Sequence, residues 1–451
     1  MRRSYLEVFN EHSYRMKMGV IKFPGKKVFV ANQPELVKQI MLDDVASFPK
    51  HKIVGDVLEP LLGESIFSTN GAKWRKQRDM LDVAFDNAQV ERVYGRMQEA
   101  VNVMLARLDA YPKDAPVDVD PEMTMVTANI IFSTIMSSDL DESQARTVID
   151  AFVRFQEASP TFALLNMLDW LGDWIPRLFD SKRRKDAKII RSSLEQVIRP
   201  RYEAFRRGEA DEHDDILSSI LRAQDPDTGQ GFAFDEIVDQ IAMLFLAGHE
   251  TSASALTWTL YLLAISPEVQ QAAFDEIVQI TGDALPGQAL APIPLAAVKR
   301  MGLVRKIFME SMRLYPPVGF FTRQTTHAMS MRDKELPQGA SVIVAPWLLH
   351  RHRELWDAPD EFCPMRFDAK TEGRGVPKNA YLPFGMGQRV CIGASFAMQE
   401  GILILAEILR RYQLELAPGF QPEPVGRLTI RSENGMRLSL RPRNAQASEV
   451  V

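Results

Sequence analysis

Apolar residues recur at helical spacing over most of the chain. The first clear example, between residues 90 and 108, has its apolar positions at Val90, Val93, Met97, Val101, Met104, Leu105 and Leu108. The same periodicity is found in six further stretches, at about 122–138, 141–158, 186–206, 236–265, 267–280 and 295–314. This pattern predicts a mainly α-helical protein.

Short strand-like runs stand at the two ends of this helical series. Residues 16–31 hold two apolar runs around Pro24 and Gly25, as in a β-hairpin, and later runs follow at Ser341–Ala345 and Met436–Leu440. No repeat or low-complexity linker separates these parts. We therefore expect one domain over 1–451, with a strand-rich start at about 16–31 and a helical core over about 32–340.

Composition and charge restrict the class of protein. With 46% hydrophobic and 25% charged residues the chain is typical of a folded globule. A net charge of -5 and a pI near 5.9 provide no basic field for nucleic acid. No run reaches the roughly 18 apolar residues of a membrane span, and the start lacks a secretory signal. We expect a cytoplasmic protein with no nucleic-acid partner and no membrane anchor.

The two cysteines, Cys363 and Cys391, are too few for a disulfide scaffold, so each is interpreted as a thiol. Cys391 stands among closely spaced glycines in the segment FGMGQRVCIG, just before an apolar helical run that begins near Ala394. Backbone N–H groups and the positive end of that helix can stabilise a thiolate there. Arg389 can reach an anionic group on a cofactor. A buried, inert cysteine is the alternative.

This segment resembles the haem-binding signature of the cytochrome P-450 family, Phe-Gly-x-Gly-x-Arg-x-Cys-x-Gly, at all six fixed positions. Chance agreement of six residues anywhere in the chain has odds of about one in 10⁵. The resemblance implies the family's triangular-prism fold, mainly α with a small β domain, and makes Cys391 the axial ligand of haem b. It implies that loop 383–393 and two helices contact the haem. The contacting residues are Pro383, Phe384, Gly385, Arg389, Ile392 and Gly393 of the loop, Ala397 of the helix after it, and Ala247 and Gly248 of an earlier helix.

A second motif follows a helix that is apolar on nearly every side, Ile237–Leu246. It reads Ala247-Gly248-His249-Glu250-Thr251, where Thr251 can bond back to the carbonyl four residues earlier and open the helix locally. The motif is similar to the family's oxygen-binding groove, in which Glu250 and Thr251 would manage protons. A merely kinked helix is the alternative, and we expect His249 to be exposed or second to the site, not an iron ligand.

Two further groups of charged residues match the family's pattern. Glu310 and Arg313, at i and i+3, together with Arg366 imply a buried structural network behind the haem. Trp74 and Arg78, at i and i+4, resemble the pair that meets a haem propionate, for which Arg323 and Arg389 are further candidates. A packed tryptophan beside a solvated arginine is the plainer reading of Trp74 and Arg78.

By resemblance, apolar segments line a pocket above the haem. These are the loop at Ile66 and Phe67, the stretch 160–178, the helix from Leu244 to Thr251, the run from Val318 to Phe321, and Leu428 with Thr429. We therefore expect a hydrophobic, medium-sized substrate such as a fatty acid or terpenoid.

The chain has no glycine-rich flavin or nicotinamide fingerprint and no cysteine cluster for an iron–sulfur centre. Electrons would then come from a separate ferredoxin or flavodoxin, for which Lys73, Arg75 and Lys76 could form a docking patch. A solvated helix face is the alternative for these three residues, as it is for the charge run from Lys182 to Lys188.

The expected reaction is monooxygenation, in which one oxygen atom of O₂ enters the substrate and the other is reduced to water. A peroxygenase, or an isomerase or dehydratase of the same family, is one alternative. Glu250 and Thr251 favour O₂, since a peroxide-driven enzyme has less need of a proton relay. A haem-binding sensor or carrier without turnover is the other alternative.

Overall fold

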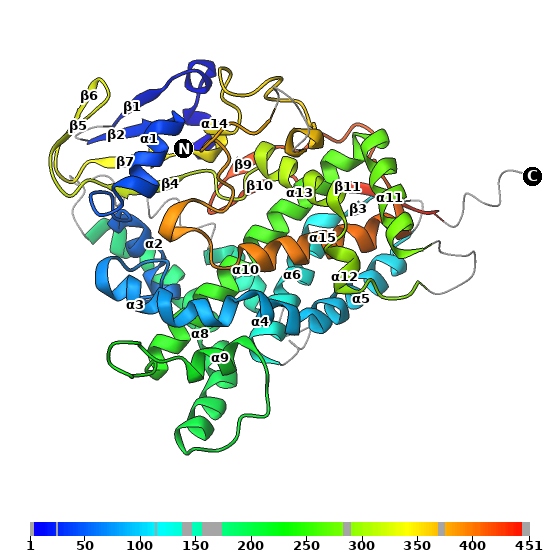
Figure 1. Ribbon diagram of the computed structural model, residues 1–451, viewed down its shortest axis with the longest axis horizontal. Coiled ribbons are helices and arrows are strands. Elements are labelled where there is room, and N and C mark those ends of the chain that lie inside the picture. Colours follow the sequence, from blue (N-terminus) through cyan, green and yellow to red (C-terminus); the bar gives the residue numbers. More distant parts are fainter. Residues whose placement is uncertain are drawn as a thin grey trace, which may run out of the picture.

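The structure is a computed structural model that describes residues 4–23, 26–112, 115–137, 147–155, 174–282, 290–368 and 375–443. Helices dominate this part of the chain (Figure 1). They are α1 (Pro34–Lys38), α2 (Lys52–Leu62), α3 (Gly71–Asp82), α4 (Asn87–Arg92), α5 (Tyr94–Ala110), α6 (Val119–Met136), α8 (Trp174–Arg206), α9 (Ile216–Arg222), α10 (Phe234–Ala264), α11 (Pro267–Thr281), α12 (Leu295–Val298), α13 (Gly302–Leu314), α14 (Pro346–Leu349) and α15 (Ala394–Arg411). Among the described helices, none combines the length and the apolar character that a membrane crossing requires.

The strands form small sheets. The largest has the order β1-β2-β7-β4, in which β2 and β7 run parallel and the other pairs antiparallel. Its strands are β1 (Met18–Phe23), β2 (Lys26–Ala31), β4 (Phe321–Gln324) and β7 (Ser341–Val344). Figure 1 shows this sheet at one corner of the molecule, with α5, α11 and α12 on the opposite side. The predicted class, mainly α with a small β part, is confirmed.

The remaining strands pair close to the helices. The order β3-β11-β8 makes a three-stranded sheet, and β9 with β10 and β5 with β6 make two antiparallel pairs. Their bounds are β3 (Val117–Asp118), β5 (Met329–Met331), β6 (Lys334–Leu336), β8 (Tyr412–Leu416), β9 (Pro424–Gly426), β10 (Ile430–Ser432) and β11 (Arg437–Pro442). The β9–β10 turn carries Leu428, one of the residues predicted to line a pocket.

Helix α10 runs through the centre of the fold and packs along α6. It stays helical from Phe234 to Ala264, so the predicted opening of the helix at 247–251 is wrong. Gly248 lies so close to the side chain of Ile131 on α6 that a Cβ atom there would collide with it. Close packing of the two helices therefore supports the glycine where propensity alone would weaken the helix.

Two of the helical stretches predicted from the apolar spacing are each divided into two helices in the structure. The stretch 90–108 divides at Val93 into α4 and α5, and 295–314 divides into α12 and α13. Of 141–158, only 147–155 is described, and it is helical. Val93 is buried although it lies between the two helices. The spacing of apolar residues therefore continues across the break and does not reveal it.

The charge run from Lys182 to Lys188 is not a uniformly solvated face. Arg183 is fully buried in α8 and pairs with Asp180 at 3.1 Å, and Asp186 is also buried and pairs with Arg154 at 2.9 Å. The expectation of a solvated face is therefore wrong for these two residues. It holds for their exposed neighbours in the same run.

A buried ion network joins α13 to the segment that precedes the Cys391 loop. Glu310 receives two hydrogen bonds from Arg313, at 2.7 and 2.8 Å, and one from Arg366 at 3.1 Å. The remaining N–H groups of both arginines point to backbone carbonyls, among them those of His350 and Ala358. The three residues thus meet as the resemblance implied, and every charge in the network has partners.

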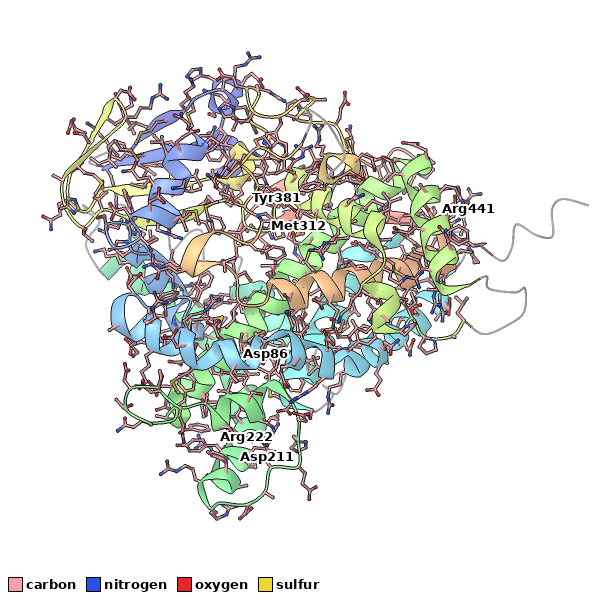
Figure 2. The ribbon with its side chains drawn as sticks, in the orientation of Figure 1. Asp86, Asp211, Arg222, Met312, Tyr381 and Arg441 are labelled. Atoms are coloured by element: carbon pink, nitrogen blue, oxygen red, sulfur yellow. The ribbon has the colours of Figure 1, made fainter. Side chains whose placement is uncertain are left out.

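The segment that follows this network also rests on α13. The hydroxyl of Tyr381 donates to the carbonyl of Met309 at 2.8 Å, and Figure 2 shows Tyr381 close to Met312 of the same helix. The amide of Leu382 donates to the ring of His350 at 2.8 Å. These contacts fix the chain two residues before the loop that carries Cys391.

Candidate functional site

The loop that carries Cys391 depends on two glycines with left-handed backbone. Gly385 and Gly387 have φ of 74° and 70°, and a Cβ atom at Gly387 would collide with the carbonyl oxygen of Met41. The loop closes through a hydrogen bond of 2.9 Å from the amide of Cys391 to the carbonyl of Phe384. Helix α15 begins three residues later, at Ala394, so its N-terminal end faces the loop.

The side chain of Cys391 keeps accessible surface although protein atoms surround most of its neighbourhood. Burial raises the pKa of its thiol above the usual range, although the amide of Gly393 and the guanidinium of Arg78 act to lower it. The Gly393 amide and Arg78 thus act in the direction expected for a stabilised thiolate, and without a bound cation burial outweighs them. A metal cation would supply the missing positive charge, since a coordinating thiol loses its proton.

Helix α10 presents an uncovered face in the middle of the core. Between residues 240 and 260, all are buried except Ala247, Gly248 and Thr251. These three have the i, i+1 and i+4 spacing of one helix face. Two of them were predicted to contact the haem and the third to handle protons. Gly248 borders Ile131 of α6, so the partly uncovered surface that indicates room for another group is that of Ala247 and Thr251.

Three arginines lie close enough to Lys50 to act on its charge, and Lys50 and one of these arginines lie over the Trp74 ring. The guanidinium of Arg389 lies 5.5 Å from the centre of the Trp74 ring and the ammonium of Lys50 lies 5.8 Å from it. The backbones of Lys50 and Arg323 pair in an isolated antiparallel β-bridge, and the side chain of Arg323 is buried. Arg78 also lies close enough to act on the charge of Lys50. We call Lys50, Arg78, Arg323 and Arg389 the cation cluster.

The positive charges of the cation cluster repel one another. Burial and then the charges of Arg389, Arg323 and Arg78 lower the pKa of Lys50 to about 6, and burial followed by Arg389 lowers that of Arg323 to about 10. The Nε atoms of Arg323 and Arg389 are buried and have no hydrogen-bond partner among the described residues. One buried and three partly buried cations with a single acidic partner among the described residues indicate a site for anions, and two haem propionates fit that requirement.

Lys50 belongs to this cluster, although no sequence motif predicted it to contribute to the site. It lies 24 positions before Trp74, outside any motif, and only the fold brings it to Trp74. Its ammonium contacts the carbonyls of Ile66 and Thr69, so it also ties the loop of Ile66 and Phe67 to the cluster. Nothing in the local sequence marks it.

Arg78 is placed differently from the other cations. It donates to the carbonyl of Val390 at 2.7 Å, next to Cys391, and pairs with Asp82 at 2.7 Å. It is the one member of the cluster with an acidic partner among the described residues. Arg78 therefore braces the Cys391 loop, in addition to contributing charge.

The three residues of the predicted docking patch are partly engaged within the chain. Lys73 pairs with Glu64, Arg75 contacts the side chain of Gln388 in the Cys391 loop, and Lys76 lies 3.4 Å from Asp225. Arg75 thus places part of this patch beside the loop. The pairings lower the free positive charge that the patch can offer.

Glu250 is a buried and firmly held carboxylate. Arg431 of β10 donates to its two oxygens at 3.0 and 2.7 Å, and Thr429 donates to it at 2.6 Å. Burial by itself would raise the pKa of Glu250, but Arg431 lowers it to about 2. Arg431 also bonds Asp120 of α6 at 2.6 Å, so one guanidinium joins α6, α10 and β10.

Thr251 makes the predicted bond, from its hydroxyl to the carbonyl of Ala247 at 2.7 Å. The neighbouring His249 is fully buried, with Nδ1 at 2.6 Å from the carbonyl of Phe245 and its ring against Phe152. Of the two expectations for His249, exposed or second to the site, burial excludes the first and leaves the second. Its packing among aromatic rings agrees with the view that it is not an iron ligand.

The residues predicted to line a pocket are placed in different surroundings. Ile66 and Leu244 are buried, and the amide of Ile66 donates to Gln240 of α10 at 3.1 Å. Phe67 is exposed, Val318 and Leu428 are partly buried, and the ring of Phe321 lies against Gly385 of the Cys391 loop. The stretch 160–178 lies outside the residues whose side chains are described.

The other predicted haem contacts lie in or directly after the Cys391 loop. Pro383, Phe384, Ile392, Gly393 and Ala397 are all partly uncovered. Ala397 is on the first turn of α15, between the buried residues Phe396 and Met398. Its partial exposure resembles that of Ala247 on α10 and is consistent with space between the two helices.

Comparisons with known proteins agree with this geometry. A family model described as Cytochrome P450 matches residues 5–440. Cyclooctatin synthase of Streptomyces melanosporofaciens is 30% identical over 91% of this chain and 85% of its own length. Pentalenene oxygenase of Streptomyces avermitilis is 26% identical over 94% and 90%. The crystal structure of the cytochrome P450DA heme domain matches with a TM-score of 0.81 and 25% identity, over 95% and 90% of the two chains.

The residues present fit the cofactor of that family. Cys391 would ligate the iron of haem b, the cation cluster would receive the propionates, and the partly uncovered residues of α10 would border the cofactor. A thiolate-ligated haem supplies O₂ activation when it is bound. The fold, the site and the comparisons together show that the chain belongs to the cytochrome P450 family of haem b oxidoreductases.

Proposed function

We propose that this P450 inserts one oxygen atom of O₂ into a C–H or C=C bond of an apolar substrate of terpenoid or fatty-acid type. The second oxygen atom leaves as water, so each turnover takes up two electrons and two protons. The electrons come from a separate ferredoxin or flavodoxin. The observation that carries the proposal is the uncovered face of α10, where Thr251 stands beside the buried carboxylate of Glu250.

Thr251 and Glu250 have different roles in this proposal. The Thr251 hydroxyl is on the partly uncovered face, where its own proton stays on the Ala247 carbonyl and its oxygen lone pairs can accept a hydrogen bond from a water or acid that delivers a proton. Glu250 is fixed as an anion by Arg431 and by the Thr429 hydroxyl. It stabilises positive charge on a proton that moves along this part of α10, and it does not need to release a proton itself.

The choice of substrate class rests on the lining and on the relatives. The lining candidates Ile66, Phe67, Leu244, Val318, Phe321 and Leu428 are all apolar. A binding site of this composition favours a hydrophobic ligand with few polar groups. Terpenoid-oxidising relatives, such as the cyclooctatin synthase and the pentalenene oxygenase named above, make a terpenoid the first compound class to try.

The electron donor is proposed to dock beside Arg75, close to the Cys391 loop. Charge reversal of Lys73, Arg75 and Lys76 should slow electron transfer from an acidic donor at low salt and have little effect at high salt. Unchanged transfer at low salt would remove the docking patch from the proposal. It would leave the site itself unaffected.

The test of the oxygen chemistry compares two threonines on one helix. Thr259 donates to the Ala255 carbonyl at 2.6 Å, the same back-bond that Thr251 makes, but it lies in the core. With a reconstituted donor and a substrate found by spectral shift, Thr251→Ala should divert electrons to hydrogen peroxide, whereas Thr259→Ala should remain coupled. Full coupling in Thr251→Ala would contradict the proposed relay.

Two further results would replace the proposed reaction. Product formed with hydrogen peroxide but not with O₂ and a donor would make the protein a peroxygenase. A stable oxygen complex without any oxidised product would make it a sensor or carrier. The two measurements use the same purified protein and the same candidate substrate.

A further inference from the structure

Glu400 on α15 is a buried acid without a cation. Nine acidic residues are buried in the described part of the chain: Glu122, Asp180, Asp186, Asp215, Asp225, Glu250, Glu310, Glu400 and Glu407. Eight of them pair with an arginine or lysine within 4 Å. Glu400 is 1% exposed, and neither of its oxygens has a hydrogen-bond partner among the described residues.

Such a residue is unfavourable for stability. Placing a polar group in the interior without a hydrogen bond costs about 1–3 kcal/mol, and an unpaired buried charge costs more. Leucine or methionine at this position of an apolar helix would avoid that cost. The position of Glu400 therefore calls for a role other than packing.

The surroundings of Glu400 connect it to the proposed oxygen site. Helix α15 follows the Cys391 loop and packs against α10. The α10 residue whose hydroxyl acts on the Glu400 carboxyl is Ser252, which is itself buried and directly follows Thr251. Ser252 therefore links Glu400 to the helix turn that carries Thr251.

The protonation state of Glu400 is opposite to that of Glu250. Burial raises the pKa of Glu400 to about 8, and the Ser252 hydroxyl offsets this only in part. Glu400 is then a neutral acid at neutral pH, whereas Glu250, with a pKa of about 2, is an anion. Other buried titratable groups on the packed helices have their own partners: His249 has the Phe245 carbonyl, Glu310 has Arg313, and Glu407 has Arg410.

We propose that Glu400 holds a proton for the reaction and delivers it through Ser252 to the Thr251 face of α10. In each delivery the carboxyl O–H bond breaks, Glu400 becomes a carboxylate, and a proton from water restores the acid. The electrons still come from the redox donor, so the balance of two electrons and two protons per O₂ is unchanged. The inference rests on the proposed oxygen chemistry, and Glu400 acts through other groups without contact with substrate.

Infrared spectroscopy of the ferric holoprotein tests the held proton directly. A protonated carboxyl has a C=O stretch that is separate from the amide bands. Wild type should show this band at neutral pH and lose it as the pH rises through about 8. Glu400→Gln should lack it. Glu407→Gln, an isosteric change on the same helix, should retain it because Glu407 is ion-paired.

Turnover tests whether the proton is used. In Glu400→Gln the fraction of electrons that ends as hydrogen peroxide should rise several-fold with O₂ and a donor, while the reduced carbon-monoxide spectrum stays that of wild type. Hydrogen peroxide brings both protons with the oxygen, so a reaction driven by it should be the same in Glu400→Gln and wild type. A merely structural residue would impair both reactions.

The inference is overturned if the carboxyl band persists in Glu400→Gln, or if that variant stays as coupled as wild type. Failure of the proposed function is recognised separately. In that case wild type forms no product from O₂, and the infrared band is present all the same, so Glu400 is a buried neutral acid without a role in turnover.

Discussion

Two groups of charged residues in this P450 differ in how completely they are compensated. In the network of Glu310, Arg313 and Arg366, every guanidinium has a carboxylate or backbone carbonyl within reach. In the cation cluster, by contrast, Lys50, Arg323 and Arg389 repel one another, and their described partners are backbone carbonyls with no carboxylate among them. The first group is complete within the protein, and the second is completed by a ligand.

The difference separates residues that hold the fold from residues that hold the cofactor. A buried charge is tolerated only where it is paired and hydrogen-bonded, so a complete network stabilises the chain that contains it. An incomplete one lowers the stability of the free protein and favours an anionic ligand. Substitutions in the complete network should therefore lower the stability of the protein without haem. Substitutions in the cation cluster should instead weaken haem binding.

The largest effect is expected in the complete network. Glu310→Ala leaves two buried guanidinium groups without their carboxylate and should lower the free energy of unfolding by about 3–5 kcal/mol. Denaturant unfolding checks the value. A loss below about 1 kcal/mol is typical of surface ion pairs and would contradict the conclusion that this network stabilises the fold.

A smaller and more selective effect is expected in the cation cluster. Arg389→Gln and Arg323→Gln each remove one donor to a propionate, which is worth about 1.5–3 kcal/mol, so haem should be lost to a scavenger protein about 10- to 100-fold more readily. Stability after haem removal should not fall, because a repulsive charge is gone. Arg366→Gln is the matched control and should show the reverse, lower stability with less effect on haem retention.

The smallest effect concerns the pH dependence of haem binding. Lys50 has a pKa of about 6 without the ligand, and propionates would raise it, so binding takes up a proton in the range above pH 6. Haem affinity should be highest at or below about pH 6 and should fall as the pH rises. Lys50→Gln should flatten this profile. A profile unchanged by the substitution would remove Lys50 from the propionate site.

Sequence patterns predicted the parts of the site that are local. The Cys391 loop places six defining residues within ten positions, and helical spacing alone puts Thr251 within reach of the Ala247 carbonyl. The fold class followed from periodicity in the same way. In each of these cases the relevant neighbours are close along the chain.

Contacts between distant segments were predicted only where the family's pattern includes them, as for Glu310 and Arg366. Arg431 lies 181 positions from Glu250, and Lys50 reaches the Trp74 ring only through the fold. The burial that raises the pKa of the Cys391 thiol was not predicted either, because donors can be read from a sequence, whereas the extent of burial cannot. The same reason applies to His249, whose neighbours give no sign that it is fully enclosed.

The central claim is that Cys391, and not Cys363, ligates the haem iron. Both cysteines are exposed among the described residues, so accessibility does not distinguish them. The reduced carbon-monoxide spectrum of the two cysteine-to-serine variants does. The account predicts that Cys391→Ser loses the thiolate-type band while Cys363→Ser retains it. A retained band in Cys391→Ser, or its loss in Cys363→Ser alone, would contradict the assignment.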